Sequence, residues 1–347
     1  MHSHWRRAAS YLALCVTAWP PLAAMPAEPV VIAHRGASGY LPEHTLASKA
    51  LAHAMQADYI EQDVVLTRDG IPIVLHDIYL DSTTDVEQRF PDRPRKDGRY
   101  YALDFSLAEI RQLNAHERTR RDKQGQTRQV YPERFPLGKG RFQVPTLAEE
   151  IELIAGLDRS RGRSTGLYIE LKAPRWHREQ GHDLAAAVIE VLEQTGYANR
   201  PGQVYLQCFD PGTLKRLHQD FETPLPLIQL IGENDWGEDG GTDYDAMRTD
   251  AGLDQVATYA AGIGPWIPQL LTPVADGQLR SSGLAQRARN RGLLIHPYTL
   301  RADQLPDEVA DLDALHHALF DGEGVDGVFT DFPDLTRAYL DRRNRRR

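Results

Sequence analysis

Cysteine is scarce in this chain, which contains 2 cysteines in 347 residues. Cys15 lies in an apolar N-terminal segment, so removal of that segment would leave Cys208 as a single thiol. A chain with one thiol forms no internal disulfide. The core of the folded protein must therefore provide its stability without covalent cross-links.

Long apolar runs are also missing beyond the N-terminus, where no stretch of about 20 uncharged apolar residues occurs. The sequence therefore predicts no membrane-spanning helix. Hydrophobic residues make up 41% and charged residues 26% of the chain, which suits a globular protein with a sizeable core and excludes a disordered one. We find no internal repeat and no low-complexity segment.

The N-terminal segment has its own composition. Arg6 and Arg7 precede a mostly apolar run, Ala8–Trp19, and small residues end the segment. This order is typical of a secretory signal peptide, so we predict one over residues 1–24 and an exported mature protein. A short membrane anchor and a lipoprotein processed at Cys15 are the alternatives.

Basic residues are fewer than acidic ones, 40 against 49, and the formal net charge is −9. Loss of Arg6 and Arg7 with the signal peptide would change it to −11. A net acidic surface argues against nucleic acid or an anionic membrane as partner. If the substrate carries a phosphate, a local cationic site must bind it.

The remaining chain alternates short apolar runs with amphipathic helical patterns. Residues 183–194, for example, place Leu184, Val188 and Leu192 on one stripe. Strands that alternate with helices predict a parallel sheet covered by helices. The strand-like runs are Val30–Ala33, Tyr59–Leu66, Ile71–Leu75, Leu167–Leu171, Val204–Cys208, Leu225–Ile231, Ala261–Gly264, Leu293–Pro297 and Val325–Thr330.

These nine runs are one more than an eight-stranded barrel needs. Only residues 67–70 separate the second run from the third, which is too short for a parallel crossover. Asp69 and Gly70 suit the turn of a hairpin instead. One of the two runs is therefore expected to be an accessory strand.

Two stretches interrupt the alternation. Residues 78–143 are rich in Arg, Asp, Pro, Tyr and Gly, with one clear helical pattern over 107–113, and residues 233–250 predict a mobile loop. Without the 66 residues of the first stretch, the mature chain of 323 residues retains 257. That length is close to the ~250 residues of a TIM (β/α)8 barrel. We therefore predict one barrel domain over 25–347, with a small subdomain inserted at 78–143 after the third strand.

Titratable side chains follow several predicted strands, at the end of the barrel where active sites lie. A single such group is unremarkable, but they recur at four successive strand ends. The groups are His34-Arg35-Gly36, Glu61-Gln62-Asp63, His76-Asp77, Glu170-Leu171-Lys172, Gln207-Cys208-Phe209-Asp210, His296-Pro297-Tyr298 and Thr330-Asp331.

Three of these side chains are candidate metal ligands. Glu61 and Asp63 are two residues apart, so both project from the same face of their strand, and Glu170 ends another strand. Three facing carboxylates repel one another unless protons, basic partners or a metal compensate. An all-oxygen set favours Ca²⁺ or Mg²⁺ over Zn²⁺. An ion-pair network with Arg35 and Lys172 is the alternative.

His34 and His76 are candidates for proton transfer, because an imidazole pKa near ~6.5 allows one ring to accept and the other to donate a proton. A structural role is the alternative for each. Arg35 and Lys172 suit phosphate oxygens. Trp266 could form a wall beside the substrate or simply fill the core. We interpret the other histidines as surface or packing residues, namely His44, His53, His116, His177, His182, His218, His316 and His317, with His296 intermediate.

The segment His34–Thr45, with the sequence HRGASGYLPEHT, resembles the signature of the glycerophosphodiester phosphodiesterase family. Residues 61–63, 74–77 and 170–172 follow in the family order and near its spacings. The long insert and the ending Phe329–Pro333 resemble the periplasmic bacterial branch. The resemblance covers essentially the whole mature chain.

The resemblance implies a distorted TIM barrel in the periplasm that hydrolyses deacylated phospholipid head-group diesters to sn-glycerol 3-phosphate and an alcohol. It also implies one divalent cation, with Ca²⁺ expected first and Mg²⁺ as the alternative. The residues that it assigns are the metal ligands Glu61, Asp63 and Glu170, the acid–base pair His34 and His76, and Arg35 and Lys172 near the phosphate.

Two other functions stay open at this point. A barrel phospholipase that acts on intact lipid should show an exposed apolar or basic membrane patch. A non-catalytic barrel that binds phosphate or sugar would not need both His34 and His76. As partners we expect small glycerophosphodiesters, no nucleic acid and no stable membrane insertion, with a homodimer as the oligomer that we consider.

Overall fold

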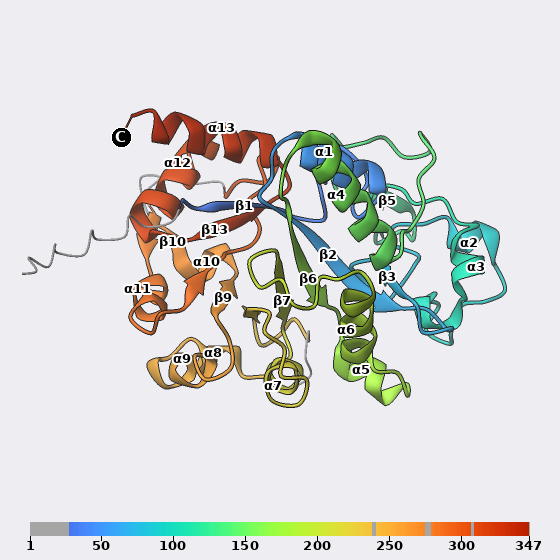
Figure 1. Cartoon of the computed structure of the whole chain (residues 1–347). Helices are drawn as coiled ribbons and strands as arrows, with labels where there is room; N and C mark the ends of the chain where they lie inside the picture. The colour runs from blue at the N-terminus through green and yellow to red at the C-terminus, as the bar shows by residue number, and fades with distance from the viewer. Residues whose placement is uncertain (1–27, 238–240, 275–278, 307–308, 347) are drawn as a thin grey trace, which may run out of the picture.

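The computed structural model describes residues 28–237, 241–274, 279–306 and 309–346 (Figure 1). The predicted signal peptide, residues 1–24, lies outside the described residues. Among the residues that the structure describes, no helix has the length and apolar character that crossing a membrane requires.

A nearly closed barrel of eight parallel strands forms the centre of the structure (Figure 1), as predicted. The strands neighbour one another in the order β12-β9-β8-β7-β6-β2-β1-β13. Between the two end strands, the N–H of Asp326 donates to the carbonyl of Ile295 at 3.0 Å. The strands are β1 (Val30–Ala33), β2 (Tyr59–Leu66), β6 (Gly166–Leu171), β7 (Val204–Cys208), β8 (Leu227–Ile231), β9 (Gly262–Pro265), β12 (Leu294–Ile295) and β13 (Gly327–Thr330).

The ninth apolar run forms the predicted hairpin. β3 (Pro72–Val74) pairs antiparallel with β2 outside the order of the barrel, with Val64 opposite Val74. Gly70 has φ +76° in the connecting turn, a conformation that glycine adopts without steric cost. The Leu75 N–H donates to the Asp63 carbonyl at 2.8 Å, so the hairpin brings the segment after β3 beside the end of β2.

Helices surround the barrel (Figure 1), and their ends follow local signals. The longest helix begins after a capping box of Thr146 and Glu149 and ends at Gly162, which has φ +64°. The helices are α1 (Leu46–Ala54), α4 (Leu147–Arg161), α5 (Pro174–Glu179), α6 (Leu184–Gln194), α7 (Pro211–Gln219), α9 (Asp250–Val256), α10 (Ile267–Leu270), α11 (Leu284–Arg289), α12 (Leu312–His317), which continues as the π-helical turn η3 (Ala318–Glu323), and α13 (Pro333–Asn344).

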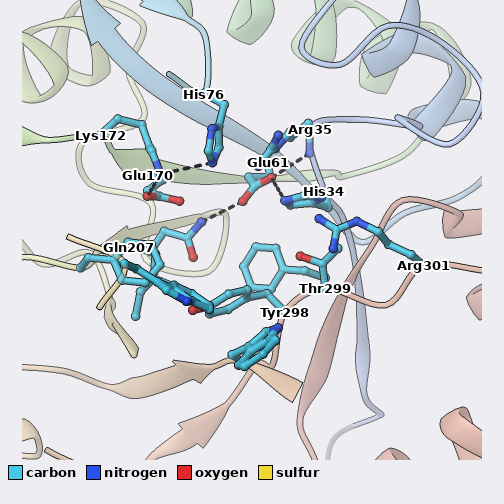
Figure 2. Close-up of a pocket in the computed structure, with 15 residues that line it drawn as sticks. His34, Arg35, Glu61, His76, Glu170, Lys172, Gln207, Tyr298, Thr299 and Arg301 are labelled. Atoms are coloured by element: carbon cyan, nitrogen blue, oxygen red, sulfur yellow. Dashed lines mark hydrogen bonds and ion pairs between the residues drawn. The ribbon is translucent and has the colours of Figure 1, made fainter. Parts of the chain in front are cut away.

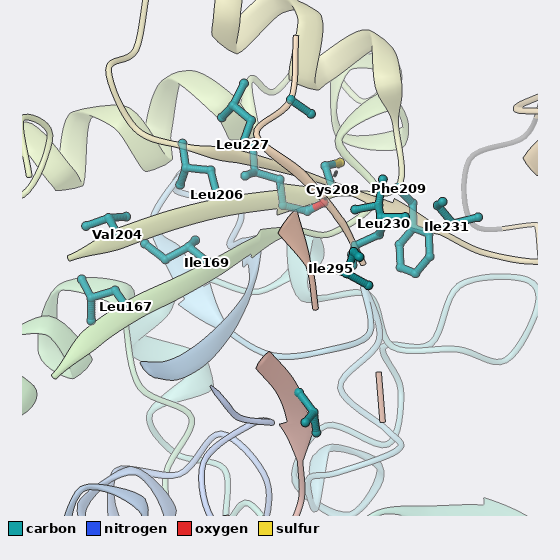
Figure 3. Close-up of a cluster of buried hydrophobic side chains, with 14 of the residues drawn as sticks. Leu167, Ile169, Val204, Leu206, Cys208, Phe209, Leu227, Leu230, Ile231 and Ile295 are labelled. Carbon is teal, nitrogen blue, oxygen red and sulfur yellow. Dashed lines mark hydrogen bonds between the residues drawn. The ribbon is translucent and has the colours of Figure 1, made fainter. Parts of the chain in front are cut away.

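The two faces of the barrel strands carry different side chains because residues alternate between faces along a strand. On β6, Leu167 and Ile169 belong to the large core between strands and helices, with Val204 and Leu206 of β7 beside them (Figure 3). Tyr168 belongs to a separate cluster with Ile32, Ile228 and Phe329. By the same alternation, Glu170 near the end of β6 projects from the same face of the strand as Tyr168.

The predicted insert, residues 78–143, has its own small core. Phe105 and Ile110 pack there with Val65 of β2 and Ile73 of β3, so the hairpin joins the insert to the barrel. The predicted helix over 107–113 is shorter than expected and ends at Ile110. The insert contains α2 (Val86–Arg89), η1 (Ala102–Asp104), α3 (Leu107–Ile110), β4 (Thr119–Arg121) and β5 (Thr127–Gln129), and a second small sheet pairs β10 (Leu271–Pro273) with β11 (Leu279–Ser281).

Residues 233–250, which we predicted to form a mobile loop, contain a short helix in the second half of the stretch. α8 (Tyr244–Met247) forms there, and the side chain of Asp243 accepts the Ala246 N–H at its start. Tyr244 is buried against Phe209, with ring centroids 6.2 Å apart. The Gly- and Asp-rich composition gave no sign of this helix, whose one buried side chain is Tyr244.

Gly166 offers a test of packing inside the barrel. A Cβ at this position would lie 2.2 Å from the Tyr59 ring, whereas a Cβ at Gly156 in α4 would meet nothing within 4 Å. We expect Gly166→Ala to lower the free energy of unfolding by about 1–3 kcal/mol. The matched change Gly156→Ala should raise it by about 0.5–1 kcal/mol. Urea unfolding measures the free energy of unfolding of both variants. Equal changes in the two variants would contradict the close packing of Gly166 against Tyr59.

His177 predicts a pH dependence of stability. Its Nδ1–H donates to the Ala173 carbonyl at 2.9 Å and its Nε2 accepts the Leu66 N–H at 3.2 Å, so only the neutral ring fits. Burial lowers the pKa of His177 from 6.5 to about 4. Between these values the unfolded chain binds a proton that the native protein excludes, so stability falls as the pH falls, by up to about 3 kcal/mol.

The comparison of wild type with His177→Gln isolates this contribution. Urea unfolding at pH 7 and at pH 4.5 should show a smaller loss of stability in the variant, because the other buried histidines are common to both proteins. An identical loss in the two proteins would show that His177 does not contribute.

Candidate active site

A pocket of about 200 Å³ lies at the C-terminal ends of the barrel strands (Figure 2). The structure brings seven of the eight predicted site residues to its wall, and Asp63 contacts the same cluster. The seven are His34, Arg35, Glu61, His76, Glu170, Lys172 and Trp266.

Glu61, Asp63 and Glu170 form a compact buried triad. One carboxylate oxygen of each lies within 4.8 Å of the others, and the residues are 3%, 1% and 5% exposed. Burial and the charge of Asp63 raise the pKa of Glu61 to about 8, and burial raises the pKa of Glu170 well above its usual value. Burial also disfavours the Asp63 carboxylate, but His44 and other basic groups hold its pKa well below its usual range.

The triad meets the requirements of a hard divalent cation. Lys172 lies 2.7 Å from Glu170 and Arg35 Nε lies 3.5 Å from Asp63, so the alternative ion pairs also form. These ion pairs supply part of the compensating positive charge, and burial still raises the pKa values of Glu61 and Glu170 because it disfavours their charged forms. Asp63 Oδ1 is buried without a hydrogen-bond partner among the described residues. Three clustered oxygen donors, one of them without a partner, fit Ca²⁺ or Mg²⁺.

The two pocket histidines are each oriented by an aspartate. His34 Nδ1 lies 2.5 Å from Asp331 Oδ1, and His76 Nδ1 lies 2.6 Å from Asp77 Oδ1. Although burial opposes ionisation, basic neighbours hold the pKa of both aspartates well below the usual range. Each carboxylate therefore accepts an Nδ1–H, and the neutral ring presents the lone pair of Nε2.

Both rings favour the neutral form in this structure. Burial and the charge of Arg35 lower the pKa of His34 from 6.5 to about 4, and they also lower the pKa of His76. His34 Nε2 lies 3.8 Å from Glu61, and His76 Nε2 lies 3.4 Å from the Lys172 ammonium. A ring in this state can accept a proton at Nε2.

A tight turn after β1 positions the cationic part of the pocket. Arg35 has φ +57°, and its N–H donates to Glu61 at 2.7 Å. Gly36 has φ +90°, and a Cβ there would lie 2.6 Å from Ser48 Oγ, so only glycine fits. Non-glycine residues in this conformation are strained and cluster at functional sites. Glu43 holds the guanidinium of Arg35 at 3.1 Å.

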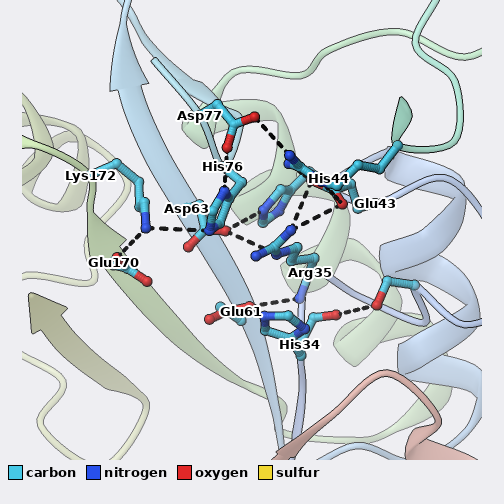
Figure 4. A network of polar contacts seen from close by, with 12 residues as sticks. His34, Arg35, Glu43, His44, Glu61, Asp63, His76, Asp77, Glu170 and Lys172 are labelled. Atoms are coloured by element: carbon cyan, nitrogen blue, oxygen red, sulfur yellow. Dashed lines mark hydrogen bonds and ion pairs between the residues drawn. The ribbon is translucent and has the colours of Figure 1, made fainter. Parts of the chain in front are cut away.

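His44, which we interpreted as a surface or packing residue, is buried and contacts the triad directly. Its Nε2 lies 2.7 Å from Asp63 Oδ2 (Figure 4), and Lys49 Nζ lies 3.1 Å from its Nδ1. Because an ammonium group can only donate, His44 donates from Nε2 to Asp63. The position of His44 within the motif His34–Thr45 is the sequence signal that could have indicated it.

Other polar groups of the site also escaped a specific assignment. Gln207 Nε2 donates to Glu61 at 3.0 Å, and Arg301 lines the pocket and contacts Asp331 at 3.0 Å. Gln207 and Asp331 occur at strand ends, which is the general signal for this edge of the barrel. Arg301 lies in a connecting segment, where no sequence pattern distinguishes it.

Aromatic side chains form an aromatic wall of the pocket, and Figure 2 shows one of them, Tyr298, on the side away from His76. Trp266 lies in this wall, and its ring centroid is 5.2 Å from that of Trp236, which is 41% exposed. Phe209 and Tyr298 also belong to the wall, and their ring centroids are 6.0 Å apart. Trp266 therefore borders the pocket in addition to packing.

Comparison with known proteins identifies the family. Residues 34–335 match the model of the glycerophosphoryl diester phosphodiesterase family. Over 331 residues the chain is 42% identical to a glycerophosphodiester phosphodiesterase of Haemophilus influenzae, covering 91% of each protein. Over 350 residues it is 36% identical to one of Treponema pallidum, covering 94% of this chain and 97% of the relative.

Solved structures share the fold. A crystal structure from Silicibacter pomeroyi matches with a TM-score of 0.68 and 25% identity, over 92% of this chain and 95% of the other. A phosphodiesterase of Oleispira antarctica, solved in complex with the product sn-glycerol-3-phosphate, matches with a TM-score of 0.60 and 25% identity, over 90% and 97%. The chain therefore belongs to the glycerophosphoryl diester phosphodiesterase family and is a phosphoric diester hydrolase.

Proposed function

We propose that this protein hydrolyses glycerophosphodiesters to sn-glycerol 3-phosphate and an alcohol with the help of one divalent cation. The observation that carries the proposal is the meeting of three buried carboxylates and two aspartate-oriented histidines around one pocket. The product bound to the Oleispira antarctica relative supports the same reaction. A pocket of about 200 Å³ suits a deacylated head group better than a lipid with two acyl chains.

Glu61, Asp63 and Glu170 would hold the cation. When bound, it would withdraw charge from the phosphate oxygens and so favour attack on an anionic diester. We propose Ca²⁺ first, on the resemblance to the periplasmic branch, with Mg²⁺ as the alternative. Arg35 and Lys172 would bind the remaining phosphate oxygens.

The histidines would divide the proton transfers. Nε2 of one ring would accept the proton of the attacking hydroxyl. The other ring, whose protonated form a bound anionic phosphate would favour, would donate from Nε2 to the leaving alkoxide. His34 and His76 suit this exchange because each has Nδ1 fixed by an aspartate. The aromatic wall with Trp266 would face the alcohol part of the substrate.

We also propose that the protein is exported to the periplasm, as the segment 1–24 predicts. The N-terminal residue of the mature protein, determined after cell fractionation, tests this. The homodimer stays a prediction, which the molar mass from light scattering tests.

Metal removal is the first test of the reaction. We expect a chelator to abolish hydrolysis of glycerophosphocholine and Ca²⁺ to restore it. Asp63→Asn should weaken Ca²⁺ binding by at least about 10-fold in calorimetry, because it removes charge at the centre of the triad. Asp254→Asn, which changes an exposed carboxylate in α9, should bind as wild type does. Full activity of verified metal-free protein would refute the metal dependence.

Substitution of the histidines tests the proton transfers. We expect His34→Ala and His76→Ala each to lower kcat by about 10²–10⁴-fold on glycerophosphocholine. The variant that lacks the acid should lose much less on a glycerophosphodiester of p-nitrophenol, whose leaving group needs no proton. His218→Ala, on the exposed face of α7, is the matched control. Near wild-type turnover in both pocket variants would exclude their catalytic role.

A further inference from the structure

Two arginines of the predicted insert, Arg118 and Arg134, reach the active site from outside the barrel. Arg118 Nη1 donates to Asp77 Oδ2 at 2.7 Å, and its Nε and Nη2 donate to Glu43 at 3.0 and 2.6 Å. The side chain is 17% exposed, so one partly buried guanidinium bridges two carboxylates.

Arg134 makes the corresponding contacts on the other side of the pocket. Its Nη2 donates to Asp331 Oδ2 at 2.6 Å, and its Nε donates to Asp303 at 2.7 Å. The side chain is 4% exposed, and its guanidinium carbon lies 3.6 Å from the centroid of the Tyr131 ring, also in the insert. Its Nη1 donates to the Ser38 carbonyl at 3.3 Å.

Asp77 and Asp331 each contact an arginine with one carboxylate oxygen and a pocket histidine with the other. Asp77 gives Oδ2 to Arg118 and Oδ1 to His76, and Asp331 divides its oxygens in the same way. Two Arg–Asp–His chains therefore begin in the insert and end in the pocket. A carboxylate that an arginine holds at one oxygen has little freedom to rotate, so the other oxygen stays aligned with Nδ1 of its ring.

We propose that Arg118 and Arg134 are positioning residues, through which the insert fixes the orientation of both pocket histidines. This inference rests on the proposed catalytic roles of His34 and His76. It assigns a function to residues 78–143, for which the sequence indicated none. The insert thus takes part in the reaction without contacting the substrate.

We expect the loss of Arg118 and the loss of Arg134 to affect the histidines to different extents. Arg301 also contacts Asp331, with Nε at 3.0 Å from Oδ2. Asp331 therefore keeps an arginine partner when Arg134 is removed. Among the described arginines and lysines, Arg118 is the one that contacts Asp77. Loss of Arg118 should therefore release His76 more completely than loss of Arg134 releases His34.

The test compares Arg118→Met and Arg134→Met in the full-length, metal-loaded protein. We expect kcat to fall by about 10- to 100-fold in Arg118→Met and by less in Arg134→Met. KM should stay nearly unchanged in Arg134→Met and rise in Arg118→Met, because Arg118 also binds Glu43, which holds Arg35. The low-field proton NMR resonance of the Nδ1–H bonded to the carboxylate should shift or broaden only for the histidine of the affected chain. Arg95→Met, which removes a bidentate pair with Asp104 in the same insert, should leave kcat and both resonances unchanged.

A double-mutant cycle separates positioning from general destabilisation. If Arg118 acts through Asp77, Arg118→Met should lower kcat no further in the Asp77→Asn background than Asp77→Asn does alone. If Arg118→Met does not fold, Arg118→Lys replaces it in the cycle, because it keeps the charge but cannot bridge two carboxylates. Additive losses of kcat would overturn the inference.

The outcomes also separate this inference from the proposed function. Wild-type kcat and unchanged resonances in both arginine variants, with His34→Ala and His76→Ala inactive, would overturn the positioning role and leave the function standing. Active His34→Ala and His76→Ala variants would refute the proposed function itself.

Discussion

The repulsion among three buried carboxylates is the constraint on which the rest of the site depends. Glu61, Asp63 and Glu170 lie within 4.8 Å of one another, where water is largely excluded. Such a cluster costs free energy unless positive charge compensates it. Arg35 and Lys172 supply part of that charge, and burial still raises the pKa of Glu61 because it disfavours the carboxylate form. A proton or a bound cation would lower the cost of the cluster further, and the three carboxylates are the ligands that such a cation would use.

The same constraint extends behind the pocket. Asp63 keeps its charge because His44 donates to it, and Lys49 determines which nitrogen of His44 carries the proton. Lys49 is fully buried and pairs with Glu150 at 3.2 Å. A buried charge is tolerated only when it is paired and hydrogen-bonded, so the triad requires a second layer of charged side chains inside the protein. This layer explains why the structure buries polar residues that a barrel alone would not need.

The insert completes the layer from outside. Its arginines neutralise Asp77 and Asp331, the two aspartates that orient the histidines, and its core joins the barrel through the β2–β3 hairpin. Glu61, Asp63 and Glu170 lie on barrel strands, whereas the two pocket histidines and the aspartates that contact them lie in the segments that follow strands. This division agrees with the way in which barrels of this class place function on the segments that follow their strands.

The sequence by itself determined the barrel, the hairpin and six of the pocket's titratable groups, because strand alternation, turn chemistry and strand ends are local features. Glu61 and Asp63 share a face for that reason, and their motif was recognisable from His34 onward. Only the tertiary structure decided which side chains contact these groups. Asp331 meets His34 across 297 residues and Arg134 meets Asp331 across 197, so no local period relates them. The contact of His44 with Asp63 was not predicted, because it arises only when the segment after β1 packs against the neighbouring strand β2.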